Sequence, residues 1–273
     1  MAKRRTSVTP EKIDRWVEEG RGSGVGKEYQ PWLRIQSFSS NGIVRRVLGW
    51  KTNRMHHLFS KLEQKYFYML EWSRATDIRE QFPLLPQTET ISIADQLGIK
   101  HPTDVKTKQP IVMTTDFLVT ISDGLTKTQY ARTLKYAKSL QSQRTMEKFE
   151  IERQYWSKRG IDWGIVTERE IPLALVTNIE FLHNYRSLDE RLGLSADQLH
   201  DIAVSLTARA QQGSSPLRQI AAEGDRALGF KPGTSLTVAY HLIASRRWMV
   251  DMYRKINPAK PIRLLAVNDR RLM

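Results

Sequence analysis

The sequence contains no cysteine, and its apolar residues never gather into a long run. The absence of cysteine excludes disulfide bonds, thiolate zinc sites and cysteine nucleophiles, and it fits a reducing compartment. No apolar stretch approaches the roughly 20 residues that a membrane-spanning helix needs. The basic start, Met1 to Arg5, is not followed by the apolar core of a signal peptide. We therefore expect a cytoplasmic protein with no membrane partner.

Acidic residues are few relative to basic ones. The chain has 29 Asp and Glu against 43 Lys and Arg, a formal net charge of +14. Such a balance favours a polyanionic partner, either nucleic acid or an anionic surface. Charge alone leaves a merely soluble basic protein as an equal alternative. The length of 273 residues is enough for one large or two ordinary domains.

A glycine-rich segment at residues 20–27 is similar to a phosphate-binding loop. That signature requires Gly, four residues, and then Gly-Lys-Ser/Thr. Arg21 stands where the first glycine belongs, and Glu28 stands where Ser or Thr belongs. The segment is therefore predicted to be a flexible linker, with contact to a DNA backbone as the alternative.

A basic hairpin is predicted next, with strands over residues 30–38 and 42–50. Trp32 and Trp50 interleave with its basic residues, which suits a nucleic-acid surface; the alternative is that the tryptophans are core and the arginines solvated. His56 and His57, expected at a helix start, would point in different directions and chelate a metal poorly. The side chains predicted to contact DNA are Arg34, Arg45, Arg46, Lys51, Arg54 and His57.

The pattern of apolar residues predicts a mixed α/β architecture for the first part of the chain. Helical periodicity covers residues 58–72 and 145–159, and short strands are expected at 76–82 and 161–167. A hairpin is predicted between strands 112–122 and 129–136, because Asp123-Gly124 flanked by apolar-rich runs favours a tight turn. Further helices are expected from residue 10 to Gly20 and over residues 92–97.

The central hairpin carries the strongest chemical signal. Asp116 lies in its first strand, and Thr133 and Lys135 share one face of the second. Glu63 lies beside the apolar stripe of helix 58–72. An acid from a helix, with an acid and a lysine from adjacent strands, is typical of metal-dependent nucleases. The alternative is a structural Asp–Lys ion pair with a solvated Glu63, which spacing alone favours.

Phosphodiester hydrolysis explains why these residue types would be needed together. Mg²⁺ prefers hard oxygen ligands, typically one or two carboxylates with phosphate and water. Asp116 and Glu63 would supply the carboxylates, and the backbone carbonyl of Thr133 could complete the ligand set. Lys135 would orient the attacking water and stabilise phosphate charge, while the cation activates that water. Mn²⁺ is expected to substitute.

Beyond Glu168 the sequence is predominantly helical. Helices are predicted over residues 173–185, 195–211, 217–228 and 235–245, with Ser195 and Ser235 as N-caps. Strands are expected at 246–253 and 262–267. Helix, turn, helix and then a hairpin is typical of a winged helix, with a plain helical bundle as the alternative. The predicted domains are residues 1–167 and 168–273.

Together these residues resemble the TnsA family, the endonuclease subunits of heteromeric transposases. The resemblance spans Trp16 to Trp163 and includes His56-His57, Gly98-Ile-Lys-His-Pro102 and Glu152-Arg-Gln-Tyr-Trp156. Its longest and most distinctive segment is Asp77-Ile-Arg-Glu-Gln-Phe-Pro-Leu-Leu-Pro86. After Glu168 it rests mainly on the order and length of the segments.

This resemblance implies a restriction-endonuclease-like N-terminal domain and a winged-helix-like C-terminal domain. It implies Mg²⁺-dependent cutting of the non-transferred strand at the 5′ side of each transposon end. The family's helical acid, strand aspartate and lysine fall on Glu63, Asp116 and Lys135. A glutamine two residues before that lysine is replaced by Thr133, so the side-chain role there is in question.

The resemblance also implies partners. They are double-stranded DNA at transposon ends, a DDE transposase (TnsB) and an AAA+ regulator (TnsC) that is gripped through the C-terminal region. The protein would then associate with the nucleoid when it acts. Two alternatives remain, a non-catalytic DNA-bridging subunit that keeps the fold and an independent nuclease. Basic residues suited to DNA or an acidic partner are Arg246, Arg247, Arg263, Arg270 and Arg271.

Overall fold

The computed structural model describes residues 8–37, 45–188 and 192–268, and it divides into two compact units between Ile171 and Pro172. This division falls four residues after the predicted boundary between residues 167 and 168. Residues 168–171 remain with the first unit because their side chains bind it. The Glu168 carboxylate accepts a hydrogen bond from the Ala137 amide, and Ile171 is buried.

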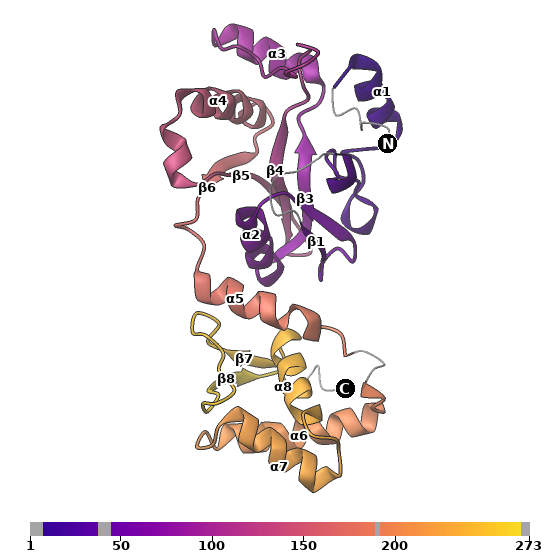
Figure 1. Ribbon diagram of the computed structural model, residues 1–273, viewed down its shortest axis with the longest axis vertical. Helices are drawn as coiled ribbons and strands as arrows, with labels where there is room; N and C mark the ends of the chain where they lie inside the picture. Colours follow the sequence, from indigo (N-terminus) through magenta and orange to yellow (C-terminus); the bar gives the residue numbers. More distant parts are fainter. Residues whose placement is uncertain (1–7, 38–44, 189–191, 269–273) are drawn as a thin grey trace. The chain divides into compact units, whose positions relative to one another are not determined.

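The first unit is built on a four-stranded mixed sheet in the order β3-β4-β5-β6 (Figure 1). The β3–β4 and β4–β5 pairs are antiparallel, whereas β6 runs parallel to β5. This arrangement confirms the predicted mixed α/β architecture. The bounds are β3 (Ala75–Pro83), β4 (Thr114–Ser122), β5 (Lys127–Leu134) and β6 (Asp162–Val166).

The central hairpin has the predicted turn. The Asp123 carboxylate accepts hydrogen bonds from the amides of Leu125 and Thr126, so one side chain closes the loop. The strands leaving it pair in register, with Phe117 opposite Arg132. Asp116 therefore lies near the end of the paired region, where β5 leads into Lys135.

Helices flank this sheet, and α4 packs beside β6 while α2 packs against β3. The helix α3 begins five residues before its predicted start at residue 92, and α2 begins after Leu58 rather than at it. The helices of the first unit are α1 (Pro10–Glu18), α2 (Lys61–Trp72), α3 (Gln87–Gln96) and α4 (Gln143–Ser157).

The predicted basic hairpin is wrong in its pairing. Residues 35–37 of the expected first strand form a single 3-10 turn, η2 (Ile35–Ser37). The strand β1 (Arg45–Leu48) instead pairs with β2 (Met55–Leu58), which contains the two histidines expected at a helix start. The connection is a tight turn in which the Gly49 amide donates to the Arg54 carbonyl.

Two described clusters contribute to the core of the first unit. Trp156, Ile151 and Leu118 belong to a cluster between α4 and the sheet. Trp16 from α1 meets Trp32 edge to face at 5.2 Å between ring centroids, and Val112 completes this second cluster. The interpretation of Trp32 as a core residue is therefore the correct one of the two alternatives.

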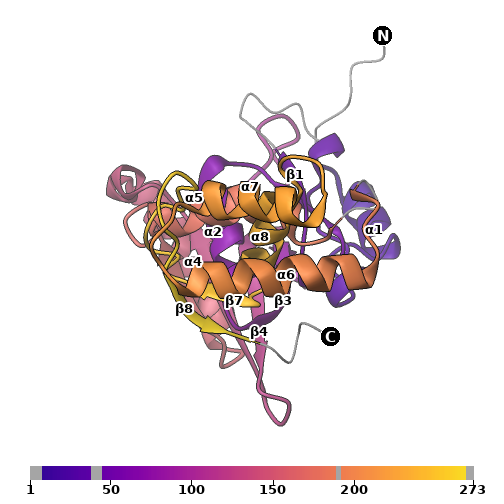
Figure 2. The same cartoon turned by 90° about the horizontal axis from the view of Figure 1, so that it is seen from below.

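The second unit follows the predicted order of helices and hairpin. In Figure 2, α6 and α7 run side by side with α8 between them, and each of the three contacts the other two. Ser195 caps α6 as predicted, whereas α8 begins at Thr234 with Gly233, not Ser235, as its cap. The elements are α5 (Leu173–Leu182), α6 (Ala196–Gln211), α7 (Leu217–Leu228), α8 (Thr234–Ala244), β7 (Trp248–Val250) and β8 (Leu264–Val267).

The helix after the turn, α8, does not offer DNA a basic surface. It contains neither lysine nor arginine, and most of its residues, including Val238, Ala239 and Leu242, are buried. The antiparallel hairpin β7–β8 follows it. Of the basic residues noted beyond it, Arg263 is exposed, whereas Arg270 and Arg271 lie outside the described residues.

None of the helices in the described parts of the chain has the length and apolar character needed to cross a membrane.

Candidate active site

Glu63 owes its position to the start of α2. The Ser60 hydroxyl accepts a hydrogen bond from the Glu63 amide at 3.1 Å and donates one to the Glu63 carboxylate at 2.9 Å. The other carboxylate oxygen accepts the Phe59 amide at 2.8 Å. This reciprocal cap holds the Glu63 side chain at the N-terminal end of the helix, where the helix dipole favours negative charge.

Asp116 is held from the opposite side of the same space. Its Oδ2 accepts a hydrogen bond from the Leu134 amide at 2.6 Å, so the carboxylate is fixed at the point where β5 ends. Its Oδ1 lies 3.5 Å from the side-chain nitrogen of Gln81, which also donates to Glu63 at 3.3 Å. The two acids, separated by more than 50 residues in sequence, therefore converge on one amide group.

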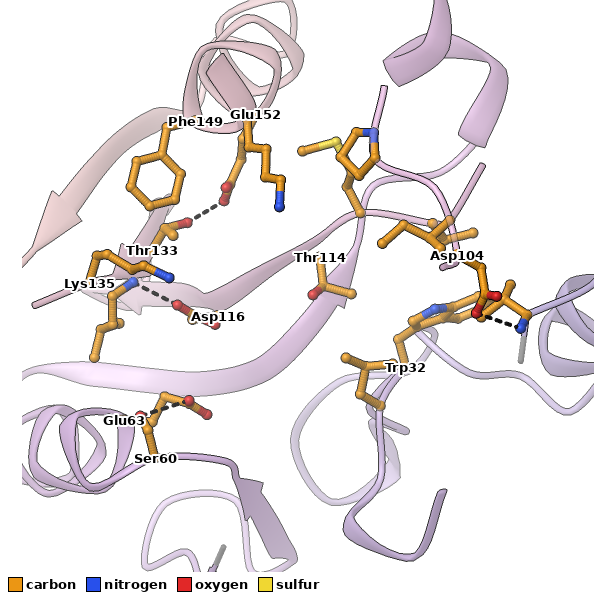
Figure 3. A pocket seen from close by; sticks show the side chains of 18 of the residues that line it. Trp32, Ser60, Glu63, Asp104, Thr114, Asp116, Thr133, Lys135, Phe149 and Glu152 are labelled. Atoms are coloured by element: carbon orange, nitrogen blue, oxygen red, sulfur yellow. Dashed lines mark hydrogen bonds between the residues drawn. The ribbon is translucent and has the colours of Figure 1, made fainter. Parts of the chain in front are cut away.

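Lys135, Thr133 and Glu152 complete one wall of a pocket of about 680 Å³ that also contains Glu63 and Asp116 (Figure 3). The Thr133 hydroxyl donates a short hydrogen bond to the Glu152 carboxylate. The Thr115 hydroxyl donates to the same carboxylate oxygen at 2.6 Å. The side chain of Thr133 thus binds Glu152 of α4. The sequence had left the role of this side chain open, because Thr133 replaces the glutamine of other family members.

Burial and mutual repulsion raise the pKa values of these acids. Burial, then the nearby charge of Asp116, raises the pKa of Glu63 to about 8. Burial raises the pKa of Asp116 to about 6, against the lowering effects of the Leu134 amide and of Lys135. Burial likewise raises the pKa of Glu152 to about 7. Such raised pKa values are typical of carboxylates gathered where a cation can bind.

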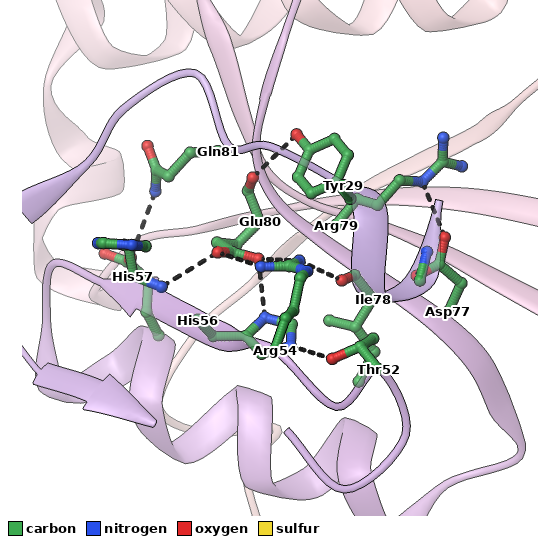
Figure 4. Close-up of polar contacts among 12 residues, drawn as sticks. Tyr29, Thr52, Arg54, His56, His57, Asp77, Ile78, Arg79, Glu80 and Gln81 are labelled. Carbon is green, nitrogen blue, oxygen red and sulfur yellow. Dashed lines mark hydrogen bonds and ion pairs between the residues drawn. The ribbon is translucent and has the colours of Figure 1, made fainter. Parts of the chain in front are cut away.

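Arg54 and His57 do not belong to a DNA-contacting surface. Figure 4 shows the Arg54 guanidinium directed inward, where it donates to the Glu80 carboxylate and to the Ile78 carbonyl. His57 is buried, and its backbone amide donates to Glu80 at 3.0 Å. The prediction of DNA contact is therefore wrong for the Arg54 guanidinium, because a fully buried carboxylate already binds it.

The other predicted DNA-contacting residues lie nearer the surface. Arg45 and Arg46 are exposed on β1, and Arg34 is half-buried with its guanidinium donating to the Gln30 side chain at 2.7 Å. The Lys51 ammonium donates to the Ser73 carbonyl at 3.0 Å. DNA contact by these four stays a prediction.

Comparison with known proteins identifies the family of this chain independently of the site geometry. Residues 73–168 match the family model described as TnsA-like endonuclease N terminal, and residues 170–252 match TnsA endonuclease C terminal. The chain is also 38% identical over 261 residues to the Transposon Tn7 transposition protein TnsA of Escherichia coli, covering 95% of this chain and 93% of that protein. The chain belongs to the TnsA family. Its central mixed sheet is consistent with the restriction-endonuclease-like fold expected of a TnsA N-terminal domain.

The donor set of this TnsA family member fits a hard divalent cation. Among the described residues, no three Asp, Glu or His side chains form a ready-made metal cluster. Glu63 and Asp116 are instead a pair, which is the number of carboxylates that Mg²⁺ commonly takes, with water and phosphate oxygens filling the remaining positions. The chemistry of the site is thus suited to Mg²⁺ or Mn²⁺.

Sequence reasoning missed Glu152 as a site residue. It lies within the segment Glu152-Arg-Gln-Tyr-Trp156 that carries part of the TnsA resemblance, but its charged neighbours on the helix favour a solvated acid. The structure places its side chain, 3% exposed, in the same pocket as Asp116 and Lys135. A signal was present in Phe149 and Trp156, whose helical spacing puts Glu152 on the buried face of α4.

Proposed function

We propose that this protein is the Mg²⁺-dependent endonuclease subunit of a Tn7-type transposition system, cutting the non-transferred strand at the 5′ side of transposon ends. The observation that carries the proposal is the convergence of Glu63 and Asp116 on the Gln81 amide, in a pocket that Lys135 also lines. Family membership supplies the reaction class, and the pocket supplies the residues that can perform it.

The residues have distinct tasks in this proposal. Glu63 and Asp116 would hold Mg²⁺, which lowers the pKa of bound water and neutralises phosphate charge. The Thr133 carbonyl, predicted as a third ligand, points away from this pair, because it belongs to the same trans peptide as the Leu134 amide that faces Asp116. The Lys135 side chain lies at the open edge of the pocket, where its ammonium can contact the scissile phosphate and orient the attacking water. Glu152 places a further carboxyl beside Thr133, fixed by the two threonine hydroxyls.

The proposed partners follow from the family. Double-stranded DNA at transposon ends would be the substrate, and the net charge of +14 supports attraction to it. A TnsB-like DDE transposase would cut and join the other strand, and a TnsC-like AAA+ regulator would bind the C-terminal unit. The absence of lysine and arginine from α8 supports a protein partner over DNA for that helix.

Strand-resolved cleavage tests the proposal. DNA carrying a transposon end, labelled separately on each strand, is incubated with the protein and Mg²⁺, with and without TnsB-like and TnsC-like partners. We expect nicks on the non-transferred strand only when the partners are present, and none in EDTA. DNA binding without cleavage in any combination would indicate a bridging subunit, and cleavage without partners would indicate an independent nuclease.

Cation binding should depend steeply on pH. With pKa values raised to about 8 for Glu63 and about 6 for Asp116, both carboxylates are largely protonated at pH 5.5 and must lose protons before a cation binds. Affinity for Mn²⁺ should therefore rise from pH 5.5 to 8, with release of protons. Calorimetry in two buffers of different ionisation enthalpy measures both quantities. Equal affinity at pH 5.5 and 8 would contradict this expectation.

A further inference from the structure

Gln81 occupies a position between the two acidic side chains. It lies in β3, is 4% exposed, and its side-chain nitrogen is within 3.3 Å of a Glu63 oxygen and 3.5 Å of an Asp116 oxygen. Glu63 comes from α2 and Asp116 from β4. One neutral donor thus links carboxylates that belong to two different elements and that repel each other.

The backbone at Gln81 is bent in a way that a strand residue normally avoids. Its φ is +50°, a left-handed conformation that costs a non-glycine residue about 1–2 kcal/mol. Glu80 pairs with Phe117 and Phe82 pairs with Thr115, so Gln81 falls opposite Asp116 without a regular pair. The bend is thus confined to the residue that faces the acid.

The surrounding structure holds this bend in place. The Gln81 carbonyl accepts a hydrogen bond from the amide of Trp32, a side chain that is only 2% exposed. On the preceding residue, the Glu80 carboxylate is bound by Arg54 and His56. Strained conformations persist where neighbours over-determine them, and they are concentrated at functional sites.

We propose that Gln81 is a positioning residue that sets the separation and aim of Glu63 and Asp116 for a divalent cation. This inference rests on the proposed function. The chemistry of the amide suits the task, because it donates to both acids without adding a charge. A lysine here would compete with the cation, and a third carboxylate would add repulsion. Partners of metal ligands in other sites typically alter metal affinity about 10–100-fold when removed.

A purely structural role makes a different prediction. If Gln81 only fills the interior, its replacement by a side chain of similar length changes stability and leaves cation affinity unchanged. The test therefore needs a variant that keeps size and loses the donor, and Gln81→Met does so. Gln129→Met is the matched control, because Gln129 lies in the same sheet and its amide donates to the Thr120 hydroxyl at 3.3 Å.

The experiment titrates the full-length wild type and both variants with Mn²⁺ at pH 8, following bound metal by electron paramagnetic resonance. Melting temperatures are recorded in EDTA and in Mn²⁺. We expect Gln129→Met to bind as the wild type does and Gln81→Met to bind about 10–100-fold more weakly. The increase in melting temperature on adding Mn²⁺ should shrink for Gln81→Met alone.

The outcomes separate this inference from the proposed function. If the wild type binds no Mn²⁺, the metal-dependent function fails. If the wild type and Gln81→Met bind equally, the function stands and the role of Gln81 is overturned. Should Gln81→Met fail to fold, Gln81→Glu decides the question, because it keeps the shape and replaces the donor with a charge. We then expect a lower melting temperature in EDTA that Mn²⁺ restores, and an unchanged melting temperature in EDTA would overturn the inference.

Discussion

Replacing Asp116 with asparagine should reduce strand cleavage by at least about 1,000-fold, equivalent to about 4 kcal/mol of transition-state stabilisation. Asparagine keeps the size of the side chain and an oxygen that can accept the Leu134 amide, which Asp116 binds at 2.6 Å. It loses the negative charge that a divalent cation requires. The fold and DNA binding should therefore persist while cleavage of the non-transferred strand disappears.

The control for this variant is Asp123→Asn in the same hairpin. Asp123 closes the turn through the amides of Leu125 and Thr126, and it lies at the opposite end of the strands from the pocket. Its replacement should leave cleavage within about twofold of the wild type. Quantifying labelled products on denaturing gels, with binding measured on the same DNA, compares the two variants. Retained nicking by Asp116→Asn would remove Asp116 from the catalytic site.

The central hairpin was predictable because its information is local. Asp123-Gly124 closes the turn with its own side chain and backbone, and alternation in the flanking strands fixes their faces. The same holds for α7, whose bounds at Leu217 and Leu228 agree with those predicted. Where a few consecutive residues contain both the signal and the contacts, sequence reasoning is sufficient.

The hairpin β1–β2 was not predictable, since its cause lies far away in the chain. His56 and His57 are in a strand because Glu80, buried in β3, binds the His56 ring and the His57 amide. Nothing in the residues around Glu80 distinguishes it from a solvated carboxylate, and the same ambiguity led to Arg54 being assigned to a DNA surface. Glu152 differs, because the spacing of Phe149 and Trp156 could have placed it on the buried face of α4.

The candidate site lies between these two cases. Spacing placed Asp116 and Lys135 on neighbouring strands, and the structure brings both to one pocket. Nothing in the spacing required Glu63 to meet them, and only the family resemblance suggested it. Gln81 contacts both Glu63 and Asp116, and its own backbone is left-handed there. The conformational preferences of glutamine do not predict such a backbone.

Glu80, Arg54 and His56 form a buried polar cluster, and its electrostatics explain why Glu80 is ionised. Burial alone would raise the pKa of Glu80, but interactions with His56 and Arg54 outweigh it, and the pKa lies well below the usual range. Burial lowers the pKa of His56, so His56 is predominantly neutral at pH 7. The permanent charge of Arg54 is therefore what keeps Glu80 ionised. The cluster contains a buried ion pair that joins Arg54, the residue before β2, to Glu80 in β3.

Replacing Glu80 with alanine should consequently destabilise the first unit by about 3–5 kcal/mol, because it leaves the Arg54 guanidinium buried without its counter-ion. Glu80 is fully buried and the Arg54 side chain is 7% exposed, so water cannot replace the lost partner. Tryptophan fluorescence during denaturant unfolding reports chiefly on this unit, since Trp248 is the only one of the seven tryptophans beyond Ile171. The midpoint should shift to clearly lower denaturant concentration.

Glu89→Ala provides the matched comparison, because Glu89 also binds an arginine through both carboxylate oxygens. Its partner, Arg159, is 30% exposed, and solvent screens the pair, so the loss should not exceed about 1 kcal/mol. A loss for Glu80→Ala as small as that for Glu89→Ala would show that Arg54 finds water or another acceptor. Arg54 would then be free to turn outward, and its assignment to the interior, rather than to DNA, would have to be withdrawn.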